Sequence, residues 1–170
     1  MARPQNSDYP QYFEGYIQQV KEDDLMEAFK IQLPVIESFL SSITEERSGF
    51  SYAPGKWTIR ELLQHCIDAE RVFNYRALCF GRKEEVSLPS FDEDSYAQHS
   101  NANARSWKSL STEFINLRIS TQDLFRSFTP EMMQAKGMAN NKEASVLSLG
   151  YISVGHLYHH MNIIKERYNN

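Results

Sequence analysis

Hydrophobic residues recur three or four positions apart along most of the chain, a spacing that is typical of helices burying one face. Four long segments show this pattern: 24–43, 58–80, 95–128 and 146–168. A shorter helical piece is expected at 12–20. Pro34 is expected to kink the first long helix, because proline removes one backbone donor and clashes with the preceding turn.

Local signals at the segment ends support the same division. Thr58 and Glu61 form a capping-box pattern, in which each side chain satisfies a free backbone N–H group at the start of the second helix. Gly81 is expected to end this helix, and Ser145 is the expected N-cap of the fourth. The polar stretches between the helices, 82–94 and 129–143, are expected to be loops.

The pattern predicts an all-α protein. No run of alternating β-branched residues bounded by turn residues indicates a strand. No Pro-, Gly- or Ser-rich linker divides the chain, so residues 1–170 are expected to form one domain with a helical core at about 24–168. Four amphipathic helices bury their apolar faces most simply as a four-helix bundle, here with a short extra N-terminal helix.

Composition narrows the possible partners and the compartment. The net charge is −4 and Lys and Arg form no block, which argues against nucleic-acid binding. The stretch 145–164 lacks charged residues, but its three histidines make it too polar for a membrane span. Two cysteines, Cys66 and Cys79, cannot form a disulfide framework, and free thiols favour the cytoplasm.

The histidines are the candidate chemistry. His156 and His160 are four residues apart in the middle of the apolar face of the fourth helix, so both side chains point toward the core. Two imidazoles in this arrangement can bind one divalent cation, and a catalytic zinc-type site needs a third protein ligand. His65, at the inner edge of the apolar face of the second helix, is the candidate.

The residues alone leave two interpretations open for this cluster: a metal site, or a hydrogen-bonded network of core histidines. Asp68 and Glu61 lie about one turn from His65 and are candidates to orient its ring, although Glu61 is already explained as a capping residue. Cys66 points away from His65 and is expected in the core. His99 is expected to be exposed.

Two motifs resemble the DinB/YfiT-like family of metal-dependent four-helix-bundle proteins. The first runs from Tyr52 to His65, YAPGKWTIRELLQH, and continues through DAER at 68–71. The second runs from Leu149 to Ile164, LGYISVGHLYHHMNII. The resemblance covers about 25–168.

This resemblance implies that His65, His156 and His160 are the metal ligands, with His159 as a neighbouring imidazole. It also implies a bundle with unusual helix connectivity, a homodimer, a divalent ion such as Zn or Ni, and a small-molecule substrate. Relatives include thiol S-transferases that use low-molecular-weight thiols, a mycothiol-dependent isomerase and metal-dependent hydrolases. We therefore expect a transferase or hydrolase whose general base is unassigned. The alternative is a non-catalytic metal-binding or dimeric scaffold protein.

Overall fold

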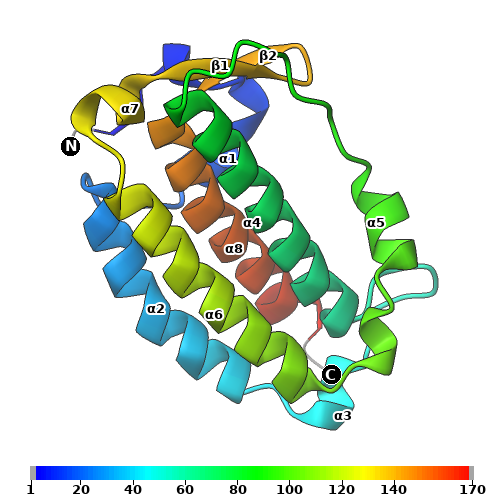
Figure 1. Cartoon of the computed structure of the whole chain (residues 1–170). Coiled ribbons are helices and arrows are strands. Elements are labelled where there is room, and N and C mark those ends of the chain that lie inside the picture. The colour runs from blue at the N-terminus through cyan, green and yellow to red at the C-terminus, as the bar shows by residue number, and fades with distance from the viewer. Residues whose placement is uncertain (1–2, 169–170) are drawn as a thin grey trace.

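Four long helices lie side by side in the computed structural model, which describes residues 3–168 (Figure 1). They are α2 (Leu25–Ser41), α4 (Ile59–Gly81), α6 (Trp107–Arg126) and α8 (Val146–Arg167). The shorter helices are α1 (Glu14–Ile17), α3 (Glu45–Ser48), α5 (Glu93–His99) and α7 (Pro130–Gln134). Three 3-10 turns, η1 (Asn6–Asp8), η2 (Gln11–Phe13) and η3 (Ala102–Ala104), complete the helical part.

The four helices do not alternate in direction. Arg105, just before α6, donates to Gln64 near the start of α4, and Asn74 further along α4 donates to Thr121 further along α6. These contacts advance together, so α4 and α6 are parallel neighbours, and Figure 1 shows α2 and α8 running the opposite way. Because α4 and α6 run in the same direction, the segment 82–106 that joins them must return along the length of the bundle, and its helix α5 contacts α4 (Figure 1).

The expectation of one continuous third helix at 95–128 is wrong. The chain forms α5, a break and η3 before α6 begins at Trp107. Asn101 at the break has a φ of 55°, a left-handed conformation that no α-helix interior adopts. Ser106 then caps the new helix by accepting from the backbone N–H of Ser109.

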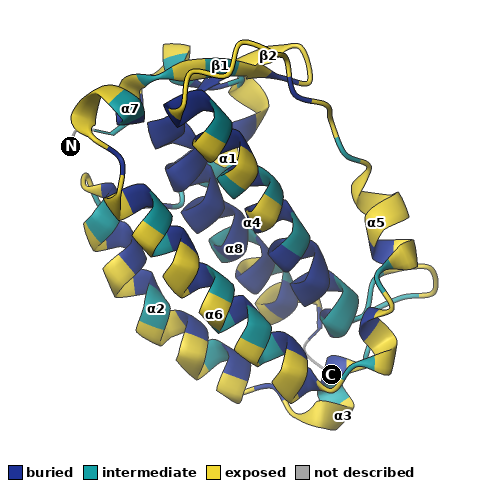
Figure 2. Ribbon diagram, viewed as in Figure 1, coloured by how far each residue is buried: buried dark blue, intermediate teal, exposed yellow. Residues whose placement is uncertain are grey.

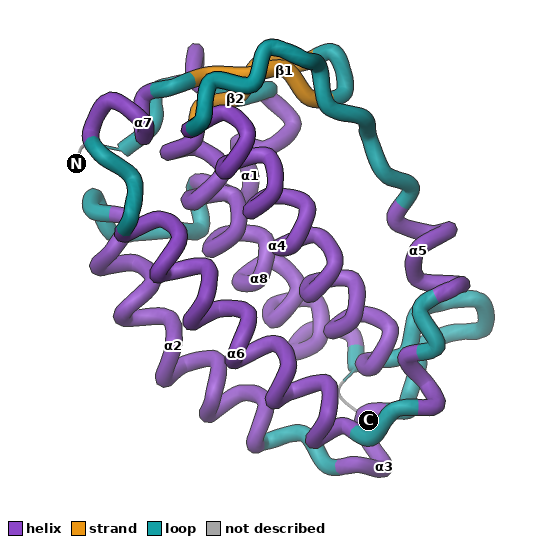
Figure 3. The backbone as a smooth tube through the Cα atoms, viewed as in Figure 1, coloured by secondary structure: helices purple, strands orange, loops and turns teal. Residues whose placement is uncertain are grey.

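The expected loop at 129–143 is also more regular than its sequence suggests. It contains α7 and an antiparallel hairpin of β1 (Lys136–Ala139) and β2 (Lys142–Ser145), which closes one end of the bundle (Figure 3). Asn140 and Asn141 form the two-residue turn with φ values of 51° and 55°. Two positive φ values are the requirement of the hairpin turn that matches strand twist, and asparagine tolerates them.

The expected helix signals are otherwise confirmed. Both hydrogen bonds of the Thr58–Glu61 capping box form, and the Ser145 side chain accepts from the backbone N–H of Ser148. α4 ends at Gly81.

α2 is helical throughout Leu25–Ser41, including Pro34, so the expected kink at this residue stays a prediction.

The segment 145–164, which lacks charged residues, forms most of α8, the most buried helix of the bundle. α8 is buried on nearly all sides over its first three turns (Figure 2). Within 3–168, no helix combines the length and the apolar character that crossing a membrane would need. The absence of charge in this segment is therefore explained by its central position among protein helices.

Candidate metal centre

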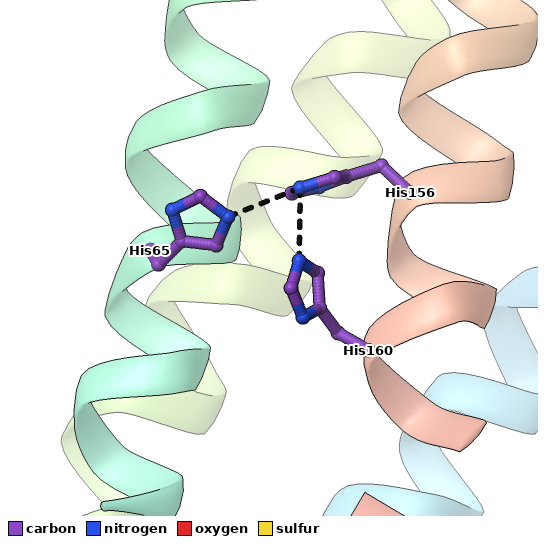
Figure 4. Close-up of side chains that lie close together, drawn as sticks. All are labelled: His65, His156 and His160. Carbon is purple, nitrogen blue, oxygen red and sulfur yellow. Dashed lines mark hydrogen bonds between the residues drawn. The ribbon is translucent and has the colours of Figure 1, made fainter. Parts of the chain in front are cut away.

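Three imidazoles meet between α4 and α8. The Nε2 atom of His156 lies 3.1 Å from Nε2 of His65 and 3.0 Å from Nε2 of His160 (Figure 4). One ring nitrogen from each histidine lies within 4.8 Å of the others. Each of the three residues is at most 9% exposed. The three histidines singled out from the sequence are thus brought together at one point in the protein interior.

The helices place these side chains by simple geometry. His156 and His160 are one turn apart on the face of α8 that is turned toward α4. His65 lies on the facing side of α4, and the antiparallel packing of the two helices brings its ring over the pair (Figure 4). Phe73, on the same face of α4, adds an edge-to-face contact with His156 at 5.8 Å between ring centroids.

Burial keeps all three rings neutral at neutral pH. Desolvation, with a smaller effect from nearby histidines, lowers the pKa of His65 to about 4 and that of His160 to about 3. The pKa of the fully enclosed His156 lies well below its usual 6.5, first because of desolvation and then because of His160 and His65. Neutral imidazole is the form that ligates a metal ion.

Hydrogen bonding alone does not satisfy this cluster. A neutral ring nitrogen carries either one proton or one lone pair in the ring plane. The Nε2 atom of His156 therefore cannot bond well to both neighbours at 3.0 and 3.1 Å. A cation between the rings would satisfy all three lone pairs. Two nitrogen ligands of a tetrahedral zinc ion lie about 3.3 Å from one another, which is close to the observed spacing.

The second ring nitrogen of His160, which faces away from the other two histidines, lacks a hydrogen bond to any residue that the structure describes. Nδ1 of His160 is buried and has no hydrogen-bond partner among residues 3–168. Metal-bound histidines usually donate this second N–H to a carboxylate or carbonyl, so the arrangement here departs from the common one.

A pocket of about 370 Å³ opens onto the histidines. Six Phe, Tyr and Trp side chains line it: Tyr12, Phe13, Tyr16, Trp57, Phe73 and Phe91. Besides the histidines, its polar side chains are those of Arg76, Ser90, Glu93, Asp94 and Asn140. The return segment 82–106 supplies one wall, so the connection required by the parallel helices also shapes the mouth of the site.

Two aromatic residues of this lining were not expected at the site. Trp57 belongs to the first sequence motif without a role of its own, and its ring centroid lies 5.0 Å from that of His65. Tyr16 packs edge-on against His156 and His159 at 5.3 and 5.1 Å between ring centroids. Gly155 permits this approach, because a Cβ atom there would lie 2.0 Å from the carbonyl oxygen of Tyr16.

The other candidate residues lie apart from the ligand nitrogens. Glu61 is engaged in the capping box, as expected. Asp68 accepts from Gln64 at 2.9 Å and lies 3.8 Å from Arg71. Neither carboxylate is therefore bonded to the His65 ring.

The remaining histidines and the neighbouring cysteine match their expected surroundings. Cys66 is buried, and desolvation raises the pKa of its thiol. His99 is exposed. His159 is half-buried beside the cluster, its ring centroid 5.1 Å from that of His160.

A comparison with known families identifies the fold. Residues 28–164 match the family model described as the DinB superfamily, which is most of the chain and contains all three histidines. The chain belongs to the DinB superfamily. The family expected from the two sequence motifs is thus confirmed, as is the helical bundle. No curated protein matches the chain by sequence.

Solved structures show how this DinB-superfamily bundle compares with others. YfiT from Bacillus subtilis, described as a probable metal-dependent hydrolase with an unusual four-helix bundle topology, is 17% identical, with a TM-score of 0.72. That match covers 96% of this chain and 90% of YfiT. A mycothiol-dependent maleylpyruvate isomerase is 10% identical, with a TM-score of 0.68. It matches 81% of this chain but only 58% of its own, and at these identities both comparisons show the fold alone.

Proposed function

We propose that this protein is a metal-dependent enzyme that acts on a small molecule. His65, His156 and His160 would hold one divalent ion, with Zn or Ni expected. The observation that carries the proposal is the convergence of three buried, neutral Nε2 atoms at the base of an open pocket. Three protein ligands and an accessible side are the arrangement of a catalytic site, whereas structural zinc sites usually have four protein ligands.

The protein side of the mechanism follows from the pocket. The histidines fix the position of the reacting group, while Trp57, Tyr16 and Phe73 surround it with aromatic surface and limit the access of water. A divalent ion held by neutral imidazoles keeps its full charge and would lower the pKa of a bound water or thiol. The substrate or a solvent molecule must supply the proton acceptor unless a pocket carboxylate reaches it.

Two reaction classes fit this arrangement. Hydrolysis is supported by the structural similarity to YfiT, described as a probable metal-dependent hydrolase. Transfer or rearrangement with a low-molecular-weight thiol is supported by the similarity to a mycothiol-dependent isomerase. Asp94 is the carboxylate with the clearest electrostatic effect on His65, and it lies on the pocket wall.

The proposal extends to the setting of the enzyme. A cytoplasmic location suits the two free thiols, Cys66 and Cys79, and a thiol co-substrate. A homodimer remains a prediction, and sedimentation or light scattering would measure it. A non-catalytic scaffold is the competing interpretation, although a pocket of about 370 Å³ ending at the histidines favours an enzyme.

Metal analysis tests the site. Protein dialysed against zinc or nickel should retain one ion per chain, and the His65→Ala variant and the His156→Ala, His160→Ala double variant should each lose it. His159→Ala and His99→Ala are matched controls that remove an imidazole outside the proposed ligand set, and both should retain the ion. Metal that persists at full occupancy in the double variant would refute the assignment, provided that circular dichroism shows a folded helical protein.

An activity screen tests catalysis separately. The metal-loaded protein is assayed with simple esters and amides, and with low-molecular-weight thiols plus an aromatic electrophile. We expect turnover that disappears with chelator and in His65→Ala. If metal binds tightly and no metal-dependent turnover is found in either set, the enzyme proposal fails and the scaffold interpretation stands.

A further inference from the structure

A buried arginine lies at the far end of the same pocket. Arg76 follows His65 by eleven residues on α4, which is about three helical turns, so both side chains lie on the same face of the helix. At about 1.5 Å per residue, their Cα atoms are separated by about 16 Å along the axis. Arg76 lines the pocket together with the histidines, and Ala69 and Phe73 lie between the two ends.

The guanidinium of Arg76 has few partners. The residue is 7% exposed, and its one hydrogen bond within residues 3–168 runs from Nη2 to the carbonyl oxygen of Pro89 at 3.0 Å. It forms no ion pair with a carboxylate in that part of the chain. Desolvation lowers the pKa of Arg76, yet guanidinium is too strong a base to lose its proton in a protein.

This isolation is unusual for a buried charge. The other deeply buried arginine, Arg118, is bonded to the carboxylate of Glu70 and the side chain of Gln32. A buried cation without an anion is costly, and five N–H donors in a fixed fork are built to receive a carboxylate. Because Arg76 borders an open pocket, a bound ligand can supply the missing anion.

We propose that the pocket selects small molecules that carry a carboxylate, which Arg76 binds, joined by an apolar or aromatic body to the group that reacts at the histidines. The inference deepens the proposed function, because it names the substrate class of that site. Phe73 from α4 and Phe91 from the return segment would contact the body of the ligand.

Two acidic residues in the lining act against an anion. Glu93 and Asp94 belong to α5, and both are exposed at the pocket wall. Solvent screens the charges of these two carboxylates. The charge of Arg76 is buried, so its attraction for an anion in the pocket is screened less. Arg76 and Glu93 both act electrostatically on Tyr12, so the exposed Glu93 lies nearer the arginine end, whereas Asp94 acts on His65 at the histidine end.

Three phenylalkyl probes of different charge test this inference, and the carboxylate and the amide among them have nearly the same shape. The probes are 4-phenylbutyrate, its neutral amide 4-phenylbutyramide, and 4-phenylbutylamine. Binding is measured by calorimetry on the full chain, in the chelator-treated and the zinc-loaded states. Arg76→Gln removes the charge at the pocket, and Arg71→Gln, also on α4 but paired with Glu113 outside this pocket, is the control for net charge.

We expect the carboxylate to bind wild type and Arg71→Gln about tenfold or more tightly than the amide, a difference typical of a charge-assisted hydrogen bond. Arg76→Gln should bind the two probes equally, and Arg76→Lys should retain part of the preference. The inference is overturned if no probe binds, if the amine binds best, or if a folded Arg76→Gln protein still prefers the carboxylate.

The chelator-treated arm separates this inference from the proposed function. The probes lack a thiol and need no metal, so a preference that depends on Arg76 in the chelator-treated protein supports the inference even if metal analysis fails. Conversely, a metal site with no carboxylate preference overturns the inference and leaves the proposed function intact.

Discussion

Replacing Gly155 by alanine should disturb the site without removing any functional group. Gly155 precedes His156 on α8, and a Cβ atom there would lie 2.0 Å from the carbonyl oxygen of Tyr16 and 2.5 Å from its carbonyl carbon. Ordinary contacts of a Cβ atom begin at about 3.4 Å, so the backbone of α1 must move away by more than 1 Å. Tyr16 would then lose its edge contacts with His156 and His159.

The magnitude follows from two opposing effects. Alanine in a helix interior is favoured over glycine by up to about 1 kcal/mol, whereas overpacking a tight contact costs about 1–3 kcal/mol. The clash is with backbone rather than with a flexible side chain, so we expect a net loss of about 1–2 kcal/mol in the free energy of unfolding. Urea denaturation should show a lower midpoint at an unchanged slope.

Gly15→Ala is the matched control. Gly15 lies in α1, and nothing is within 4 Å of a Cβ atom built there. The control should therefore be as stable as wild type or slightly more stable. If Gly155→Ala and Gly15→Ala unfold at the same urea concentration, the close approach of α1 to α8 does not constrain the structure and the reasoning is wrong.

Three further predictions concern charge. Because the pKa of folded His65 is about 4, the unfolded chain binds one more proton than the folded chain between about pH 6.5 and pH 4. The free energy of unfolding of the metal-free protein should therefore fall by about 3 kcal/mol from this residue between pH 6.5 and pH 4. Urea denaturation at several pH values measures this, and His65→Ala should show a weaker dependence on pH. Zinc binding at pH 6 should release less than one proton, where three ordinary histidines would release about two, and calorimetry in two buffers of different ionisation enthalpy measures this number. Glu70→Gln should lower the free energy of unfolding by about 3–5 kcal/mol, because it leaves the fully buried Arg118 without its carboxylate. Glu113→Gln, in a partly exposed ion pair, should lower it by about 1 kcal/mol or less in the same urea denaturation experiment.

The helices could be predicted because the information that specifies them is local. Apolar spacing marks the buried face of each helix, and the Thr58–Glu61 and Ser145 caps act within four residues. The pairing of His156 and His160 is local in the same sense, since four residues make one turn. No tertiary contact is needed to obtain any of these features.

The meeting of His65 with the C-terminal pair could not be obtained in this way. It depends on α4 packing antiparallel against α8, and no pattern within either helix specifies its neighbour. The resemblance to a family supplied that link. The place of Arg76 in the pocket was not predicted either. Its position eleven residues after His65, on the same face of the helix, is a signal that the sequence contains.

The segments that were predicted wrongly connect the long helices, and their structure depends on where the next helix must begin. The third helix was expected to begin at Ser95, in the polar stretch 95–106 ahead of the apolar spacing that starts at Trp107, but a straight helix there could not return the chain along the bundle to start α6 parallel to α4. The chain turns at Asn101 instead, with a left-handed residue that periodicity does not detect. Likewise, the short hairpin at 136–145 has too few residues to show an alternating pattern.

The helix order has a direct consequence for chemistry. In an alternating bundle, a short loop would join α4 to the next helix, and no connecting segment would need to run along the bundle. Here two consecutive helices are parallel, so a long connection must pass over α4, and it contributes Phe91, Glu93 and Asp94 to the pocket wall. The candidate ligands are thus fixed on rigid helices, while one wall of the pocket is made by a segment that can vary in sequence without moving the histidines. Under the proposed function, this division would let one bundle keep a His-based centre while the pocket wall, and with it the choice of substrate, changes.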